Sequence, residues 1–458
     1  MSTEAPHAPS GSDQGSVRPV LFEVAPAPEP VPVLPGGAPR VRVPDRFQMR
    51  MEMSSLDALL PPDHQARVVW EYVEGLDLSG LYDCIRAVEG GPGRDSLDPR
   101  IPMALWLYAT LDGVGSARQL DRLCRDHVAY RWICGGVSVN YHTLSDFRTG
   151  NLDLLDGLLT QSVAGLMHEG LVTMERVAQD GMRVRAHAGT SSFRRGQTLE
   201  RLEAEARAQI EALRKELEDD PGATTKRQQA ARERARRERR ERIARARQVF
   251  PEIQRKKPAD KKDQARASTT DPDARFMKMP DGGIRPAVNV QTATDTGSGI
   301  ITGVDLSNNG SDMGQMGPMI RQHEERYGER PPEMLVDGGF AARDDIDAAS
   351  TAEPPTVVYA PVQKSRKDEG KNCYARQPAD TDAVAAWRQR MSTAEAQAIY
   401  KKRASTAEWV NALARNRGMQ QFLVRGLRKI KAVVLWFALA HNLVRAAALR
   451  RQVAVATA

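Results

Sequence analysis

The second half of the chain alternates short apolar runs with helical segments, and this alternation limits the folds open to it. Strand-like runs are expected at residues 174–189, 286–310, 333–337 and 356–362. The first reads as two short runs around Asp180 and Gly181, and the second alternates around the turn "DTGSG", which predicts a hairpin. Helical spacing is found at about residues 312–327, from about 343, and at about 393–417 and 430–449. This order predicts an α/β domain over residues 173–447, built as a mixed sheet flanked by helices.

Residues 1–172 have a different character. Residues 1–44 are rich in Pro, Ala, Gly and Ser, so they bury too little apolar surface to offset the entropy of ordering, and we expect a disordered tail. Residues 45–172 carry apolar side chains at three- and four-residue spacing, which predicts an all-helical domain. At the other end of the chain, residues 448–458 are expected to form a flexible tail.

Residues 196–265 interrupt the α/β pattern with charged helices. The first reads "TLERLEAEARAQIEALRKELEDD" and is closed by Pro221 and Gly222, and the second reads "KRQQAARERARRERRERIARARQVFPEI". Neither carries enough apolar surface to be a core. We therefore predict an antiparallel helical hairpin inserted into the α/β domain.

The composition is basic. The chain has 66 Lys and Arg against 59 Asp and Glu, a net charge of +7, which favours a polyanionic partner but leaves a role without nucleic acid equally open. Its four cysteines, scattered without CxxC pairing, indicate neither a zinc site nor a disulfide framework, and a reducing cytoplasm fits best. No apolar run reaches the length of a membrane span, and the N-terminus lacks the pattern of a secretory signal.

Two of the apolar runs are followed by an aspartate and a glycine. Asp180 precedes Gly181 in "RVAQDG", and Asp337 precedes Gly338 in "MLVDGG". One such stretch alone is explained by a turn. If the two strands are neighbours, however, both carboxylates project from one sheet edge, where their charges repel. A pair of Mg²⁺ or Mn²⁺ ions removes that repulsion and suits nuclease or polynucleotidyl-transfer chemistry on a phosphodiester.

That chemistry needs a third carboxylate, and the helix at residues 393–417 offers Glu408. Basic and aromatic side chains fall near the same face of this helix, namely Tyr400, Arg403 and Arg415. An ordinary solvated helix is the alternative interpretation, and Glu395 is the rival carboxylate.

Several stretches resemble motifs of one family. They are "PRIPMALWLYATLDGVGSARQLDRLCRDHVAYRWICGG" with "HTLSDFR", then "DGMRVRAHAG", "ARASTTDPDARFMKMPDGGIRPAVNVQ", "VDGGF" and "YKKRASTAEWVNALARNRG". On these stretches the chain resembles the bacterial insertion-sequence transposases, which have a DDE catalytic domain of ribonuclease-H-like fold, a helical N-terminal domain and a charged helical insertion. The resemblance extends from about Arg46 to Ala447. Asn411 and Ala412 stand where the family frequently has Phe-Gly.

The resemblance implies a catalytic and metal-binding triad of Asp180, Asp337 and Glu408, which would hold two Mg²⁺ or Mn²⁺ ions. It implies cleavage of DNA at transposon ends and attack of the freed 3′-hydroxyl on target DNA. It also implies a cytoplasmic, nucleoid-associated protein that binds double-stranded DNA, at terminal inverted repeats and at the target, as a homodimer. An inactive DNA-binding descendant and a nuclease of the same fold remain alternatives.

The basic residues are interpreted by their position. We expect Tyr400, Arg403 and Arg415 to hold phosphates near the scissile bond. Further candidate DNA contacts are Arg183, Arg118 and Arg148. The run from Arg232 to Arg247 is either an electrostatic DNA clamp or a solvated hairpin with internal salt bridges.

Three further polar residues are given structural roles. Asp305 and Asp312 flank the "LSNNGS" loop and are interpreted as turn residues. Asn442, within the apolar helix at residues 430–449, is interpreted as a packing or capping residue.

Overall fold

The computed structural model describes residues 55–88, 90–91, 95–219, 225–363 and 372–457, together with Pro44, Arg46, Phe47 and Met53. The predicted tail at residues 1–44 lies outside the described residues except for Pro44. The residues from Ser54 to Ala458 form one compact unit.

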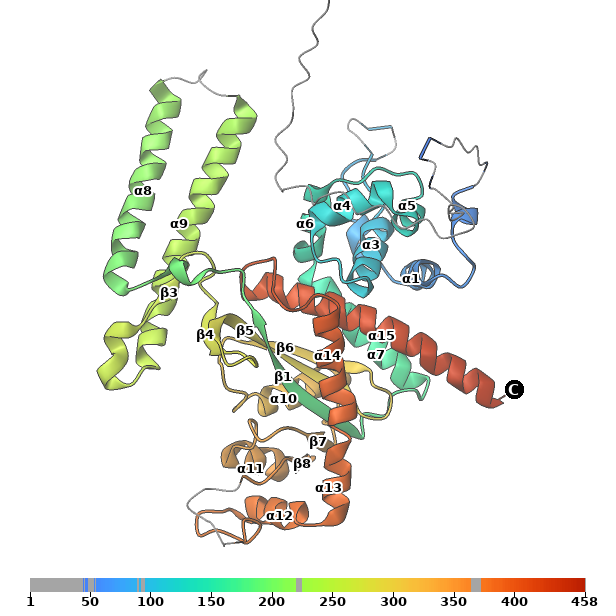
Figure 1. The fold of residues 1–458 in the computed structure, drawn as a ribbon, viewed down its shortest axis with the longest axis vertical. Helices are drawn as coiled ribbons and strands as arrows, with labels where there is room; N and C mark the ends of the chain where they lie inside the picture. The colour runs from blue at the N-terminus through green and yellow to red at the C-terminus, as the bar shows by residue number, and fades with distance from the viewer. Residues whose placement is uncertain are drawn as a thin grey trace, which may run out of the picture. The chain divides into compact units, whose positions relative to one another are not determined.

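The N-terminal part of this unit is helical, as predicted (Figure 1). A 3₁₀ turn at Asp57–Leu59 precedes helices α1 (Gln65–Glu74), α2 (Ser79–Tyr82), α3 (Arg100–Leu111), α4 (Ala117–Asp126), α5 (Val128–Cys134), α6 (Tyr141–Gly150) and α7 (Leu152–His168). Helix α3 is central, because its residues from Ile101 to Ala109 are all buried. Its Trp106 donates the indole N–H to the Leu144 carbonyl of α6 at 2.9 Å, which fixes the two helices together.

The later part of the chain forms the predicted mixed sheet, which has six strands among the described residues. They are β1 (Arg176–Arg185), β4 (Arg275–Lys278), β5 (Ile284–Asp295), β6 (Ile301–Ser307), β7 (Glu333–Leu335) and β8 (Val357–Tyr359). Strand β1 lies between β5, which runs antiparallel to it, and β7, which runs parallel to it. The other side of β5 pairs first with β4 and then with β6, and β8 pairs parallel with β7. The hairpin predicted at residues 286–310 is confirmed as β5–β6.

Helices cover the sheet and complete two cores. They are α10 (Met316–Tyr327), α11 (Arg343–Thr351), α12 (Asp382–Met391), α13 (Ala394–Lys401), α14 (Trp409–Asn416) and α15 (Leu427–Thr457). The larger core joins the N-terminal helices to α15 and to the sheet, and the smaller one lies among β7, β8 and helices α10 to α13.

Helix α15 is the central helix of the larger core. On length and hydropathy, Leu427–Ala456 is the one stretch among the described residues that could cross a membrane, so the expectation that no run is long enough was wrong. However, 67% of its most apolar window is buried inside the protein. It packs against α3, α7 and β6, which is the position of a core helix. It continues to Thr457, through the residues expected to form a flexible tail.

Helices α8 (Gly196–Asp219) and α9 (Lys226–Arg255) pack against each other as the predicted hairpin (Figure 1). The short strands β2 (Phe193–Arg194) and β3 (Ala267–Ser268) pair antiparallel at its base. A small apolar cluster there includes Leu199 and Val249. Further out, ion pairs such as Arg232 with Glu216 link the two helices.

Asn442 provides a test of how α15 is fixed to the sheet. Its side-chain oxygen accepts from the Ile301 N–H, and its amide donates to the Ile301 carbonyl, both at 2.8 Å in a buried setting. We predict that Asn442→Leu lowers the free energy of unfolding by about 2 kcal/mol, because both backbone groups lose their partner without access to water. Urea denaturation measures this change. The exposed Asn416→Leu serves as the control and should change stability by less than about 0.5 kcal/mol.

Candidate active site

Asp180 lies within a strand and not at its end. The interpretation of residues 174–189 as two short runs was wrong, because β1 continues through Asp180 and Gly181 to Arg185. Strand β5 pairs with β1 along this whole length, with Asp180 opposite Thr292, and so keeps the backbone extended past the glycine. Asp337 does follow its strand, two residues after β7 ends at Leu335.

The register of β1 and β7 brings the two aspartates together. Ala178 lies opposite Leu335 in this parallel pair, and each aspartate is two residues further along its own chain. Neighbouring strands are about 4.8 Å apart, so Asp180 and Asp337 stand side by side where β7 leaves the sheet. The Gly339 N–H donates to Asp337 Oδ1 at 2.7 Å and holds this carboxylate in the turn.

Asp180 is largely buried, and its surroundings act on its charge. Burial raises the pKa of Asp180 to about 6, Arg403 opposes that rise, and the charge of Asp337 adds to it. Asp180 Oδ2 accepts from Asn411 Nδ2 at 2.9 Å, and Oδ1 accepts from the Gly181 N–H at 3.0 Å. Burial and the neighbouring Asp337 therefore oppose the negative charge of Asp180 more strongly than Arg403 and these hydrogen bonds favour it.

Glu408 reaches this cluster through a distortion of its helix. The helix predicted at residues 393–417 consists of α13, a π-helical segment at Ala404–Glu408 and α14. In a regular α-helix, residues five apart point about 140° away from each other. The wider π turn brings Arg403 and Glu408 to one side, where Arg403 Nη2 lies 2.6 Å from Glu408 Oε1.

Arg403 therefore connects the acidic groups. Its Nη1 lies 3.4 Å from Asp180 Oδ1, while its Nη2 forms an ion pair with Glu408. Glu408 joins Asp180 through this guanidinium and not directly, and its side chain is 53% exposed. Within the described part of the chain, no three Asp, Glu, His or Cys side chains gather closely enough to hold a metal ion. Asp180 and Asp337 form the pair whose repulsion a cation would relieve.

The other candidate residues on the glutamate helix differ in position. The ring of Tyr400 lies 5.9 Å from the guanidinium carbon of Arg403, so it lines the same cluster. Arg415 is exposed on α14.

The remaining basic candidates lie away from this cluster. Arg183 projects from the opposite face of β1, where it lies 3.6 Å from Asp312. Arg118 is exposed, and its guanidinium lies 4.9 Å from the centre of the Tyr141 ring. Arg148 is stacked 4.5 Å from the Trp106 ring and lines a cavity between the helical part and the loop that joins α14 to α15.

Asp312 is a site residue that sequence reasoning missed. It is buried and accepts from Asn289 Nδ2 at 2.7 Å and from Gln291 Nε2 at 2.8 Å. These two residues alternate along β5, so both lie on the face that Gly181 leaves bare. A side-chain carbon at Gly181 would lie 2.0 Å from Asp312 Oδ1, and one at Gly339 would lie 3.6 Å from its Oδ2. Asp312 therefore packs against the glycines that follow both aspartates.

Asn411 was missed as well, although it donates directly to Asp180. The sequence does carry a signal for the network around Asp312. Asn289 and Gln291 are two residues apart on either side of Val290, so they lie on one face of the strand, and buried amides need a partner. No comparable signal marks Asn411, because its contact with Asp180 depends on how α14 packs on β1.

These observations define an α/β protein with a helical N-terminal region and two adjacent carboxylates, Asp180 in strand β1 and Asp337 just beyond strand β7. Two family models match the chain. The model described as Transposase domain (DUF772) matches residues 54–150, and the one described as Transposase DDE domain matches residues 363–447. The matches support an insertion-sequence DDE transposase, as the motifs indicated. The second segment contains Glu408, whereas Asp180 and Asp337 lie outside both.

A search of curated proteins and a search of solved structures gave no significant match.

The close packing at Gly181 leads to a prediction. Gly181→Ala should lower the free energy of unfolding by about 1–3 kcal/mol, because the new methyl group must displace the carboxylate of Asp312 and the amide of Gln291. Thermal or urea unfolding measures the change. The matched control is Gly157→Ala in α7, where nothing lies within 4 Å of the added carbon, so the substitution should stabilise the helix by about 0.5–1 kcal/mol. Equal effects of the two substitutions would contradict this account of the Asp312 network.

Proposed function

We propose that the protein is a DDE transposase that cuts DNA at transposon ends and joins the freed 3′-hydroxyl to target DNA. One observation carries the proposal. The β1–β7 register brings Asp180 next to Asp337, and Arg403 links Asp180 to Glu408, which lies in the segment matched by the Transposase DDE domain model. The three acidic residues are distant in sequence, so only the tertiary fold brings them into one connected cluster.

Asp180, Asp337 and Glu408 are the residues that would hold two Mg²⁺ or Mn²⁺ ions. Asp180 and Asp337 fit this role, since they are adjacent, partly buried and mutually repulsive. Glu408 would complete the set when its exposed side chain leaves Arg403. When bound, the ions would supply the positive charge that stabilises the attacking and leaving oxygens of a phosphodiester.

The protein's own groups prepare this site. Asn411 orients Asp180, and the Asp312 network fixes the strand and the turn that carry the two aspartates. Arg403 balances part of the negative charge and, once Glu408 is released, can contact a DNA phosphate. Tyr400 and Arg415 would position the DNA backbone next to it without reading its sequence.

The larger architecture fits the same activity. We infer a ribonuclease-H-like catalytic domain at residues 173–447, in which residues 196–265 form a helical insertion, preceded by a DNA-binding domain at residues 45–172. The basic face of α9 would contact double-stranded DNA at terminal repeats or target. Pairing of two transposon ends would use a homodimer, acting on the nucleoid in the cytoplasm.

Conservative substitutions test the triad. We predict that Asp180→Asn, Asp337→Asn and Glu408→Gln each reduce cleavage by about 10³-fold or more, because each removes several kcal/mol of charge stabilisation from the transition state. The assay uses a labelled transposon end with Mn²⁺ and follows both cleavage and joining. Glu395→Gln, an exposed carboxylate on α13, is the control and should keep wild-type rates.

The same assay separates the alternatives. The proposal requires that the wild type joins ends to target and that the three variants still bind DNA. Cleavage without joining would indicate a nuclease of the same fold. DNA binding by the wild type without any cleavage would indicate an inactive, transposase-derived DNA-binding protein.

Metal binding can be measured without DNA. We predict that Mn²⁺ raises the Tm of the wild type, because an ion that binds only the folded state stabilises it by mass action. Asp180→Asn and Asp337→Asn should abolish the increase, while Glu395→Gln should keep it. An equal increase in all four proteins would place the ion elsewhere and refute the role of the aspartates.

A further inference from the structure

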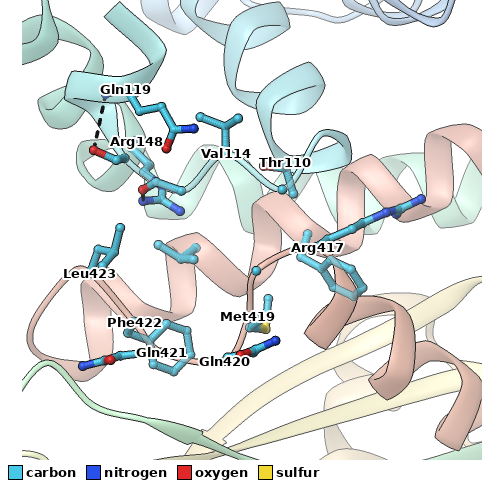
Figure 2. Close-up of a pocket in the computed structure, with 16 residues that line it drawn as sticks. Thr110, Val114, Gln119, Arg148, Arg417, Met419, Gln420, Gln421, Phe422 and Leu423 are labelled. Carbon is cyan, nitrogen blue, oxygen red and sulfur yellow. Dashed lines mark hydrogen bonds between the residues drawn. The ribbon is translucent and has the colours of Figure 1, made fainter. Parts of the chain in front are cut away.

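A cavity lies between the helical part of the protein and the loop that joins α14 to α15 (Figure 2). Its volume is about 410 Å³. One wall is the α3–α4 connection with the start of α4, including Gly115 and Gln119, and the other is the stretch from Arg417 to Leu423. The first wall lies in the segment matched by the DUF772 model and the second in the segment matched by the DDE model.

Arg148 is the charged group of interest in this cavity. It is largely buried, it stacks on Trp106, and its Nη1 donates to the Gly115 carbonyl. Its Nε is buried and has no hydrogen-bond partner. No carboxylate among the described residues pairs with it, although a buried guanidinium is normally paired because desolvation of its charge is costly.

The rest of the lining favours an anion. Asp and Glu are absent from the residues that line the cavity in the described structure, whereas amides are present at Gln119 and Gln421. Arg417 also lines the cavity, but in Figure 2 its side chain runs away from Arg148. The cavity therefore combines the unpaired guanidinium of Arg148 with neutral hydrogen-bond donors, and the buried Nη1 of Arg417 also has no hydrogen-bond partner. Cations and neutral donors together are the chemistry that binds a phosphate group.

The cavity is connected to the strand that carries Asp180. The Phe422 N–H donates to the Arg185 carbonyl at 2.9 Å, and the Arg185 N–H donates to the Gln420 carbonyl at 3.2 Å. Arg185 is five residues beyond Asp180 on β1, a separation of about 17 Å, or about five base-pair steps of duplex DNA. A duplex whose scissile phosphodiester lies at Asp180 is therefore able to place another backbone phosphate, about five base pairs away, at the cavity.

We propose that this cavity binds a phosphate group through Arg148, and that DNA supplies that phosphate when the enzyme holds a transposon end. The claim that DNA supplies the phosphate rests on the proposed function. The claim that the cavity binds phosphate does not, because free inorganic phosphate has the same chemistry. Binding at this position would hold the DNA backbone against both family-matched segments at once.

The DNA arm of the test measures equilibrium binding of a labelled duplex by the full chain at several salt concentrations. Arg148→Gln removes the cation, and Gly115→Leu fills the cavity while it keeps the cation. A side-chain carbon at Gly115 makes only ordinary contacts, the nearest being 3.7 Å from Leu423, so the backbone can accept this change. The binding constant K falls as salt rises, so the slope of log K against log salt is negative. We expect both variants to make this slope less negative by about 0.9, the value for one lost phosphate contact.

Arg125→Gln is the charge-matched control. Its side chain on α4 is 60% exposed and pairs with Asp121, away from the cavity lining. It should leave the slope unchanged. If Arg148→Gln alone makes the slope less negative and Gly115→Leu does not, the charge acts at a distance and the cavity assignment is overturned. Melting curves of all variants establish that they are folded.

The second arm titrates the wild type and the same variants with inorganic phosphate by calorimetry. Binding to the wild type and to Arg125→Gln, but not to Gly115→Leu or Arg148→Gln, supports the phosphate site even if the DNA slopes do not change, and then identifies free phosphate as the source. If the variants behave like the wild type in both arms, the proposal is overturned. A wild type that binds no DNA at all would refute the proposed function, and the phosphate titration would still decide the cavity.

Discussion

The parallel pairing of β1 with β7 is the interaction on which the site depends. It involves only three residue pairs, from Arg176 opposite Glu333 to Ala178 opposite Leu335. Those pairs determine which residue of one strand faces which residue of the other, and hence that Asp180 and Asp337 are neighbours. A shift of one residue would turn one aspartate to the other face of the sheet. The ion pair between Arg176 and Glu333, at the start of this register, helps to hold it.

The charge balance around the aspartates follows from that pairing. Two carboxylates brought together by the backbone repel each other, and the protein supplies one guanidinium, Arg403, which it shares with Glu408. Sharing is possible because the helix widens into a π turn at this point. A distortion of this kind lowers the regularity of the helix, and such turns are frequently found at functional sites. The π turn therefore places one guanidinium between Asp180 and Glu408.

Much of the fold could be predicted from local patterns. Apolar spacing identified the N-terminal helices and α15, and alternation around "DTGSG" identified the β5–β6 hairpin, because these elements bury one defined face. The break of the 393–417 helix into three segments could not be predicted, since nothing in its composition marks the π turn. Asp180 was expected at a strand end because the glycine after it suggested a turn. The pairing with β5 overrides that local tendency.

The site was predictable only in part, for a related reason. Asp180 and Asp337 were found because each follows an apolar run and precedes a glycine. Asp312 was interpreted as a turn residue, and its burial depends on Asn289 and Gln291 from another strand. Asn411 reaches Asp180 across 231 positions of sequence. Contacts of this range are set by tertiary packing, which single-residue preferences do not encode.

The position of helix α15 determines how the protein unfolds. It packs on α3 and α7 on one side and on β6 on another, so the N-terminal helices and the sheet share one apolar core. Separating the two regions would expose buried side chains of both to water. The helical region and the sheet are therefore expected to melt in a single cooperative transition, and neither region is complete until α15 has packed between them.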